Sequence, residues 1–313
     1  MALRRPCAEQ MSALPIEDLV QELAEDNTSG AAELTKRAAE VLVLLAQQSM
    51  AQETTDFLSE LVAAGKQVIQ AQPSMAPLFN LVNSVLSRLG AAQDTVEARR
   101  ITEAASKGFA ADLALRGERI GQEAVSLIAD RSTVMTHSRS STVMRAFLMA
   151  KAEGRRFQVL CTESRPMLEG REVARELAGQ GIETKLTIDC AVADLMGEID
   201  LVMVGADSIS AAGLVNKIGT QGAALAAAAH GVPFYALCGT EKFLPASYPY
   251  LEIEPKDPRE VWNGYPEGVE VVNYYFDVTA LRYVSGVVTE RGTLLPAQVE
   301  ELLGQLKVHE ALL

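Results

Sequence analysis

The sequence predicts an α/β protein with a helical N-terminal domain and a second domain built on a doubly wound parallel sheet. Up to about residue 130 the apolar residues recur at helical spacing. From residue 133 onward, short apolar runs alternate with helical stretches, a pattern typical of parallel α/β sheets. We therefore divide the chain into a helical domain over residues 1–130 and a ligand-binding domain over residues 131–313.

Four helices are predicted in the N-terminal part. Residues 33–47 carry an apolar stripe at three- and four-residue spacing, and the run Asp-Asn-Thr-Ser at 26–29 supplies N-cap candidates before it. The other helices are expected at 57–70, 78–89 and 95–128. The last of these is long, charged and rich in alanine, and we expect it to connect the two domains.

The second part of the chain alternates between strands and helices. Six apolar runs are predicted to be strands: Thr133–Thr136, Phe157–Cys161, Thr184–Ile188, Leu201–Val204, Pro233–Leu237 and Gly286–Thr289. Helices are expected between the first five, at Thr142–Lys151, Gly170–Ala178, Ala191–Met196 and Gly222–His230. Residues 252–280 interrupt this alternation with prolines, glycines and aromatic residues, including Trp262, and predict a functional or interfacial loop.

Polar segments follow four of the predicted strands. They read THSRSS (136–141), CTESRP (161–166), GADS (205–208) and CGTEKF (238–243). Parallel α/β sheets bind ligands at the carboxyl ends of their strands, so these segments predict one cleft. The same arrangement predicts that Val134, Leu160, Val202 and Tyr235 lie on neighbouring strands.

The stretch LVMVGADSISAAGLVNKIGT (201–220) carries the most chemistry. Asp207 directly follows a buried apolar run, and Asn216 and Lys217 come soon after it. A buried carboxylate is costly unless it is paired or used, so an acid and a cation at a strand end favour a reactive site. The alternative is a helix N-cap aspartate with a solvated lysine.

A second candidate feature is an anion site. Arg139, Ser140 and Ser141 open a predicted helix, where free backbone N–H groups and hydroxyls favour a phosphate. The alternative is a serine N-cap beside a surface arginine.

The polar segments at the strand ends contain three further candidate groups: one histidine and two pairs of oppositely charged residues. His137 either donates to a ligand oxygen or is a satisfied structural histidine. Glu163 and Arg165 are expected to pair with each other, with an anion facing Arg165 as the alternative. Glu241 and Lys242 are expected to form an ion pair.

Composition narrows the classes of function. The net charge of −13 argues against a broad nucleic-acid surface. The four scattered cysteines suit a reducing compartment, and no cluster has the spacing of a metal site. No phosphate-loop or dinucleotide-binding motif is present, so no cofactor is predicted. The first residues lack the apolar core of a secretory signal, and no apolar run approaches ~20 residues, so we expect a cytoplasmic protein without a membrane partner.

Four motifs together resemble a known family: CTESRP, VGADSI (204–209), NKIGT (216–220) and YFDVTA (275–280). This family holds the alpha, beta and delta subunits of translation initiation factor 2B. It also holds the aldose–ketose isomerases acting on methylthioribose 1-phosphate and ribose 1,5-bisphosphate. The resemblance covers nearly the whole chain. It implies a helical N-terminal domain, a Rossmann-like C-terminal domain and a homodimer formed through the latter.

The resemblance also implies roles for individual residues. Asp207 matches the catalytic aspartate of the isomerases, and Asn216 and Lys217 match a pair that contacts the substrate or its phosphate. The catalytic cysteine of the isomerases falls on Ser138, and Gln72 stands where the family commonly has an arginine. A thiol exchanges protons near neutral pH far more readily than a hydroxyl does.

Two functions from different classes follow. The first is an isomerase of a phosphorylated pentose-like sugar, with Asp207 and Ser138 catalytic and with the sugar phosphate bound by His137, Arg139, Ser140, Ser141, Asn216 and Lys217. The second is a non-catalytic protein like initiation factor 2B alpha, which senses a sugar phosphate or nucleotide and acts through a translation-factor partner. The aspartate favours the first function, and the missing cysteine favours the second.

Overall fold

The structure is a computed structural model that describes residues 15–27, 29–248 and 253–313. Cys7, the N-terminal segment and the first residue of the predicted aromatic loop lie outside the described residues. The chain forms two compact units, one of residues up to Leu113 together with Lys307–Leu313, the other of Ala114–Leu306. The division between them falls inside a long helix, α6 (Thr95–Val125), rather than at residue 130.

The first unit is helical. It contains α2 (Ile16–Glu25), α3 (Ala31–Gln48), α4 (Thr54–Ala71), α5 (Ala76–Leu89) and the first part of α6. Large side chains such as Leu34, Phe57 and Phe79 are fully buried among these helices. The end of the chain returns to this unit because Asn83 holds it: Asn83 Nδ2 donates to the Lys307 carbonyl at 2.9 Å, and the His309 N–H donates to Asn83 Oδ1 at 2.8 Å.

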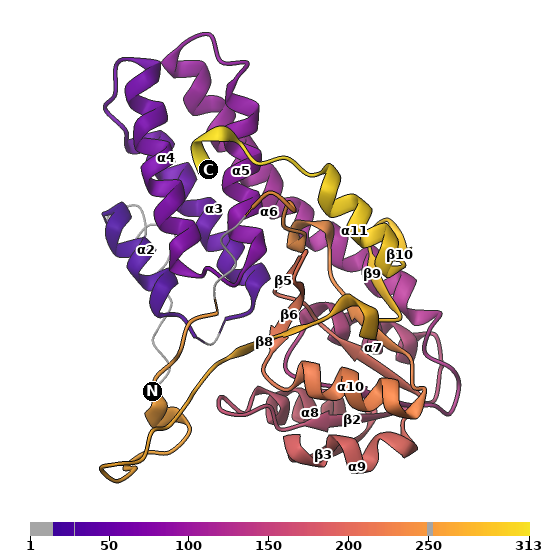
Figure 1. Cartoon of the computed structure of the whole chain (residues 1–313). Coiled ribbons are helices and arrows are strands. Elements are labelled where there is room, and N and C mark those ends of the chain that lie inside the picture. Colours follow the sequence, from indigo (N-terminus) through magenta and orange to yellow (C-terminus); the bar gives the residue numbers. More distant parts are fainter. Residues whose placement is uncertain (1–14, 28, 249–252) are drawn as a thin grey trace. The chain divides into compact units, whose positions relative to one another are not determined.

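The second unit is built on a seven-stranded sheet in the order β10-β9-β7-β4-β1-β2-β3. Figure 1 labels its two edge strands, β10 and β3. The strands are β1 (Thr133–Thr136), β2 (Gln158–Thr162), β3 (Glu183–Thr187), β4 (Leu201–Val204), β7 (Phe234–Leu237), β9 (Gly286–Thr289) and β10 (Gly292–Leu294). All pairings are parallel except that of β10 with β9. Val134, Leu160, Val202 and Tyr235 therefore lie on neighbouring strands, as predicted.

Helices cover both faces of this sheet. Val134 and Val159 face a core with the end of α6, α7 (Ser141–Ala152) and α8 (Glu169–Gly179). The adjacent residues Met135 and Leu160 face a second core with α9 (Val192–Leu195), α10 (Thr220–His230) and α11 (Pro296–Gln305). Because successive residues of a strand point to opposite faces, these two cores confirm the doubly wound sheet.

A second, smaller sheet was not anticipated. It has the order β5-β6-β8 and is antiparallel, with β5 (Ser208–Ser210), β6 (Gly213–Lys217) and β8 (Phe276–Thr279). Its register pairs Asn216 with Asp277 and Lys217 with Phe276, which brings the motifs NKIGT and YFDVTA together. β8 also lies inside the predicted aromatic loop, where Trp262 is half exposed.

Two other expectations from composition bear on the described residues. Cys161 and Cys238 are buried, as small thiols of a reducing compartment would be, whereas Cys190 is exposed. Among the described helices, none combines the length and the apolar composition needed to cross a lipid bilayer.

Candidate functional site

The polar segments that follow β1, β2, β4 and β7 meet at the carboxyl edge of the large sheet. The Ser138 N–H donates to Ser164 Oγ at 2.8 Å, which joins the segments after β1 and β2. Gly205 lies against Ser140, since an added Cβ at Gly205 would be 2.8 Å from the Ser140 side chain. The Leu244 N–H donates to the Ile209 carbonyl at 2.8 Å, which ties the segment after β7 to β5. The predicted convergence at one edge is therefore confirmed.

Asp207 stands at this edge, directly after the Gly-Ala step that ends β4. Burial raises the pKa of its carboxyl above the usual range for aspartate. The ammonium groups of Lys242 and Lys217 oppose this rise in pKa, and the carboxylate of Glu169 adds to it. No side chain in the described part of the chain forms a hydrogen bond or salt bridge with the Asp207 carboxyl. The group is therefore a weakened acid that is open to a ligand.

Glu169, which is partly exposed, and the buried Lys217 form an ion pair beside Ser138. Lys217 Nζ lies 3.1 Å from Glu169 Oε1, and the Ser138 hydroxyl donates to the same oxygen at 2.7 Å. Lys217 is only 8% exposed, and its ammonium sits 4.7 Å from the centre of the Tyr275 ring. Sequence reasoning missed Glu169, because an acid at a helix start is usually a capping residue.

The chain places Glu169 here through a glycine. At Gly170, an added Cβ would lie 1.8 Å from the carbonyl oxygen of Thr162 at the end of β2. Only glycine lets the first turn of α8 pack this closely on the strand end. Glu169 is consequently held over the carboxyl edge of the sheet.

Ser138 is held in an unusual backbone conformation. Its φ of 66° lies in the left-handed region, which costs a residue other than glycine about 1 kcal/mol. The hydrogen bonds from its N–H to Ser164 and from its hydroxyl to Glu169 fix it there.

Asn216 and Asp277 organise the turn from β6 into α10. Asn216 Nδ2 donates to Thr220 Oγ1 at 3.0 Å. Asp277 Oδ2 accepts from the N–H groups of Gly219 and Gln221 at 2.8 and 3.0 Å, so a protein carboxylate already caps this helix. Burial raises the pKa of Asp277 to about 6, although the two hydrogen bonds from the backbone act to lower it.

His137 is buried and uses both ring nitrogens. Its Nε2 lies 2.8 Å from the Ile218 carbonyl and its Nδ1 lies 2.6 Å from Thr162 Oγ1. A carbonyl only accepts, so Nε2 carries the proton and Nδ1 accepts from the threonine hydroxyl. Burial lowers the pKa of the imidazole, which favours this neutral form. In this structure His137 secures the turn before α10 rather than presenting a free nitrogen.

The residues at the start of α7 that were expected to bind an anion have protein contacts or face solvent. Ser140 Oγ accepts from the Val143 N–H at 3.3 Å and forms the N-cap of α7. Arg139 pairs at the surface with Glu176 at 3.3 Å, and Ser141 is exposed. A phosphate at Ser140 and Ser141 stays a prediction.

The expected pair of Glu163 and Arg165 is wrong. Glu163 pairs with Arg171 of α8 at 2.7 Å, and Arg165 Nη2 donates to the Val261 carbonyl at 2.9 Å. Ser164 lies between them with a φ of 61°, and this left-handed turn separates the two side chains.

The expected pair of Glu241 and Lys242 is also wrong. Glu241 pairs with Arg116 at 3.2 Å, and adjacent residues in a helical turn point in different directions. The Lys242 side chain forms no hydrogen bond or salt bridge with the residues that the structure describes, and its ammonium group opposes the rise in the pKa of Asp207 more than that of Lys217 does.

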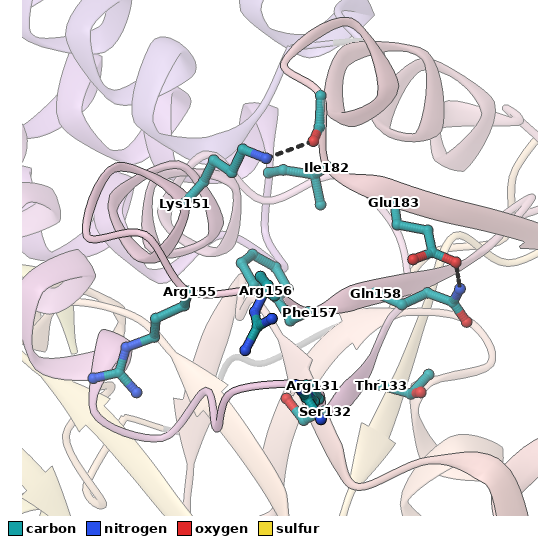
Figure 2. A pocket seen from close by; sticks show the side chains of 11 residues that line it. Arg131, Ser132, Thr133, Lys151, Arg155, Arg156, Phe157, Gln158, Ile182 and Glu183 are labelled. Atoms are coloured by element: carbon teal, nitrogen blue, oxygen red, sulfur yellow. Dashed lines mark hydrogen bonds between the residues drawn. The ribbon is translucent and has the colours of Figure 1, made fainter.

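A basic pocket of about 470 Å³ lies at the opposite, amino edge of the sheet (Figure 2). Its cations have partners: Lys151 donates to the Gly181 carbonyl, Arg155 to the Ile128 carbonyl, and Arg156 pairs with Asp130 at 2.7 Å. Because these charges support loops, the carboxyl edge is the better candidate for chemistry. Within the described ranges, no group of three or more His, Cys, Asp or Glu side chains could hold a metal ion.

Comparison with known proteins decides the family. The profile of the initiation factor 2 subunit family matches residues 27–296. The chain belongs to this family. The resemblance inferred from its four motifs is therefore confirmed.

The proteins similar to this chain are named either as sugar-phosphate isomerases or as translation initiation factors. Ribose 1,5-bisphosphate isomerase of Haloterrigena turkmenica is 33% identical over 300 residues, 91% of each chain. Methylthioribose-1-phosphate isomerase of Chloroflexus aurantiacus is 37% identical over 295 residues, 87% of this chain and 85% of its own. The crystal structure of translation initiation factor eIF-2B from Pyrococcus horikoshii superposes with a TM-score of 0.79 at 30% identity, covering 90% of this chain and 98% of that one.

Gln72, where the resemblance led us to expect an arginine in relatives, has a structural role in this chain. It is buried, and its Nε2 donates to the carbonyls of Leu23 and Asp26 at 3.0 and 3.1 Å. The amide thus binds the end of α2 to the end of α4 within the helical unit.

Proposed function

We propose that this member of the initiation factor 2 subunit family is an aldose–ketose isomerase acting on a phosphorylated pentose-like sugar. The observation that carries the proposal is the Asp207 carboxyl at the carboxyl edge of the sheet. It has a raised pKa, lies near the ammonium groups of Lys217 and Lys242, and accepts no hydrogen bond from the described residues. The names of its isomerase relatives supply the class of substrate.

The reaction needs one acid and one base. In an aldose 1-phosphate the oxygen on C1 is esterified, so the ring must open and a hydrogen must move from C2 to C1. Ring opening places a proton on the ring oxygen, and formation of the C2 carbonyl removes the proton of the C2 hydroxyl. Asp207, whose raised pKa favours the protonated form, is suited to donate the first proton. Ser138 stands where the isomerases of the family place their cysteine and is proposed to contact the C2 hydroxyl.

The sugar phosphate is proposed to bind beside these groups. Lys217 supplies charge, Asn216 and His137 shape the wall of the site, and the start of α7 at Arg139, Ser140 and Ser141 supplies N–H groups and hydroxyls. No cofactor is needed for a transfer of hydrogen within one molecule.

We further propose that the protein is a cytoplasmic homodimer formed through the sheet domain, residues 131–313. Trp262 is 50% exposed and Val272 is 63% exposed, and apolar side chains of this kind are costly on a free surface. Light scattering of the purified protein is expected to give twice the mass of one chain, and the mass of a single chain would refute the dimer.

The second candidate function is a regulatory protein like initiation factor 2B alpha, which binds a sugar phosphate or nucleotide without turnover and acts through a translation-factor partner. Ser138 in place of a thiol favours it. So does the similarity to a putative translation initiation factor eIF-2B subunit 2-like protein of Pyrococcus horikoshii, at 32% identity over 282 residues.

An assay of the purified protein against a panel of aldose 1-phosphates separates the two functions. The panel includes ribose 1,5-bisphosphate and methylthioribose 1-phosphate, and ³¹P and ¹³C spectra report the ketose. The isomerase is expected to convert at least one sugar. Binding of a sugar phosphate without any conversion would favour the regulatory function and refute the proposed isomerase function.

A further inference from the structure

The two oxygens of Glu169 have different surroundings. Oε1 accepts a hydrogen bond from the Ser138 hydroxyl at 2.7 Å and pairs with Lys217 at 3.1 Å. Oε2 is buried and has no hydrogen-bond partner among the described residues. An ion pair with a purely structural role would be expected to satisfy both oxygens, because a buried polar atom without a partner is costly. Glu169 therefore calls for an explanation beyond packing.

Ser138 is oriented by the same contact. Its hydroxyl proton points to Glu169, and its oxygen accepts no hydrogen bond from the side chains and backbone that the structure describes. A serine hydroxyl has one donor and two acceptor positions, so the oxygen is left to accept from a ligand. Ser138 is partly exposed, in contrast to the buried His137 next to it.

We propose that Glu169 is the proton acceptor that lets Ser138 act where related enzymes have a thiol. The hydroxyl on C2 of the sugar donates its proton to Ser138 Oγ while the Ser138 proton passes to Glu169 Oε1. This inference rests on the proposed isomerase function and deepens it. Ser138 touches the substrate, and Glu169 acts through Ser138 as a positioning and proton-accepting residue.

The step balances in protons and electrons. One O–H bond breaks on the sugar and one on Ser138, while one forms on Ser138 and one on Glu169. The electron pair left on the sugar oxygen forms the C2 carbonyl as the hydrogen on C2 moves with its own pair to C1. C1 accepts that pair because Asp207 has protonated the ring oxygen and the C1–O bond has opened. The proton on Glu169 then returns to Asp207 by exchange with water.

The surroundings separate the two carboxyl groups into an acid and a base. Burial raises the pKa of Asp207 and favours its protonated form. Glu169 instead pairs with Lys217 and accepts the hydrogen bond of the Ser138 hydroxyl. Two carboxyl groups in different surroundings are the usual way for one site to hold both an acid and a base.

Kinetics of variants on a turned-over aldose 1-phosphate test the inference. Glu169→Gln keeps an oxygen that accepts from Ser138 but cannot take the proton, so kcat is expected to fall about 10²–10³-fold with KM within threefold. Ser138→Ala leaves the Glu169–Lys217 pair intact, and its kcat is expected to fall by a similar factor. The double variant with Glu169→Gln and Ser138→Ala is expected to have a kcat no lower than that of either single variant, because the two residues act as one unit. Adding Ser138→Cys to Glu169→Gln is expected to raise kcat at least tenfold above that of Glu169→Gln alone. A cysteine can accept the proton as a thiolate and does not need Glu169.

The matched control is Glu172→Gln, an exposed glutamate one turn further along α8 that pairs with Arg175 at the surface. It is expected to keep wild-type kcat and KM. If Glu169→Gln raised KM while kcat held, Glu169 would only position Lys217 and the inference would be overturned. Additive losses in the double variant, or no rescue by the thiol, would overturn it as well. Absence of turnover by the wild type would instead refute the proposed function, and thermal unfolding of each variant identifies a loss that comes from misfolding.

Discussion

The two edges of the large sheet both carry charged side chains, but the charges are used differently. At the amino edge, Lys151, Arg155 and Arg156 each donate to a carbonyl or carboxylate of the protein. At the carboxyl edge, the side chains of Asp207 and Lys242 have no hydrogen-bond or salt-bridge partner in the described part of the chain, and Glu169 Oε2 is buried without a hydrogen bond. The amino edge has a pocket of about 470 Å³, yet these three cations of its lining already have protein partners. Polar groups left without a protein partner, rather than charge or volume, therefore indicate the site.

The largest expected effect comes from Asp207→Asn. The amide keeps the shape of the carboxyl but cannot deliver a proton, so turnover of an aldose 1-phosphate should fall by about 10²–10⁴-fold. Binding of the same sugar phosphate, measured by calorimetry, should stay within about fivefold. A variant that still turns over at the wild-type rate would place the chemistry on another residue.

Gly170→Ala should damage the carboxyl edge through the fold. The new Cβ would meet the Thr162 carbonyl oxygen at 1.8 Å and the carbonyl carbon at 2.9 Å, and these backbone atoms cannot turn aside as a flexible side chain could. We expect a loss of about 3 kcal/mol in the free energy of unfolding, measured with denaturant. Gly222→Ala in α10 is the control, because an added Cβ there meets nothing within 4 Å, and it should be neutral or stabilising by up to about 1 kcal/mol. Equal behaviour of the two variants would contradict the role given to Gly170.

A smaller effect is expected from the pH dependence of Asp277. Its pKa is raised from 3.8 to about 6 in the folded protein, so the folded state binds this proton more tightly than the unfolded state. The stability that the bound proton contributes is therefore lost as the pH rises from the unfolded-state pKa of 3.8 to the folded-state pKa of about 6. Relative to Asp277→Asn, the wild-type free energy of unfolding should fall by about 2 kcal/mol between pH 4 and 7. A difference that does not change with pH would show that the carboxyl is not desolvated.

The sequence was sufficient for the parallel strands of the large sheet, because most of them are short, buried apolar runs bounded by turns, but it missed the short antiparallel edge strand β10. It was not sufficient for the small sheet, whose strands β5 and β6 contain serines, Asn216 and Lys217 and lack an apolar run. Helix α11 was also missed, since only Val299 and Leu303 of it are buried.

The site was predicted as far as it depends on strand ends. Asp207 and Ser138 could be placed at one edge because each follows a recognisable strand. Lys217 was placed there by its closeness to Asp207 in the sequence and by the motif NKIGT, since the strand that carries it was not recognised. Glu169 could not be placed there, because only the close packing of Gly170 on β2 brings it to Ser138 and Lys217. The ion pairs expected between sequence neighbours were wrong for a related reason: local backbone turns, as at Ser164, decide where neighbouring side chains point.

Titration of a sugar phosphate into two matched lysine variants tests the central claim, that the carboxyl edge holds the ligand. Lys217→Met removes the buried ammonium at this edge, and Lys151→Met removes a cation of the amino-edge pocket; thermal unfolding checks that both remain folded. We predict that Lys217→Met weakens binding of ribose 1,5-bisphosphate by about 10–100-fold, as expected for a charged hydrogen bond, and that Lys151→Met stays within twofold of wild type. The reverse order, with binding lost in Lys151→Met and kept in Lys217→Met, would contradict the account and assign the ligand to the amino edge.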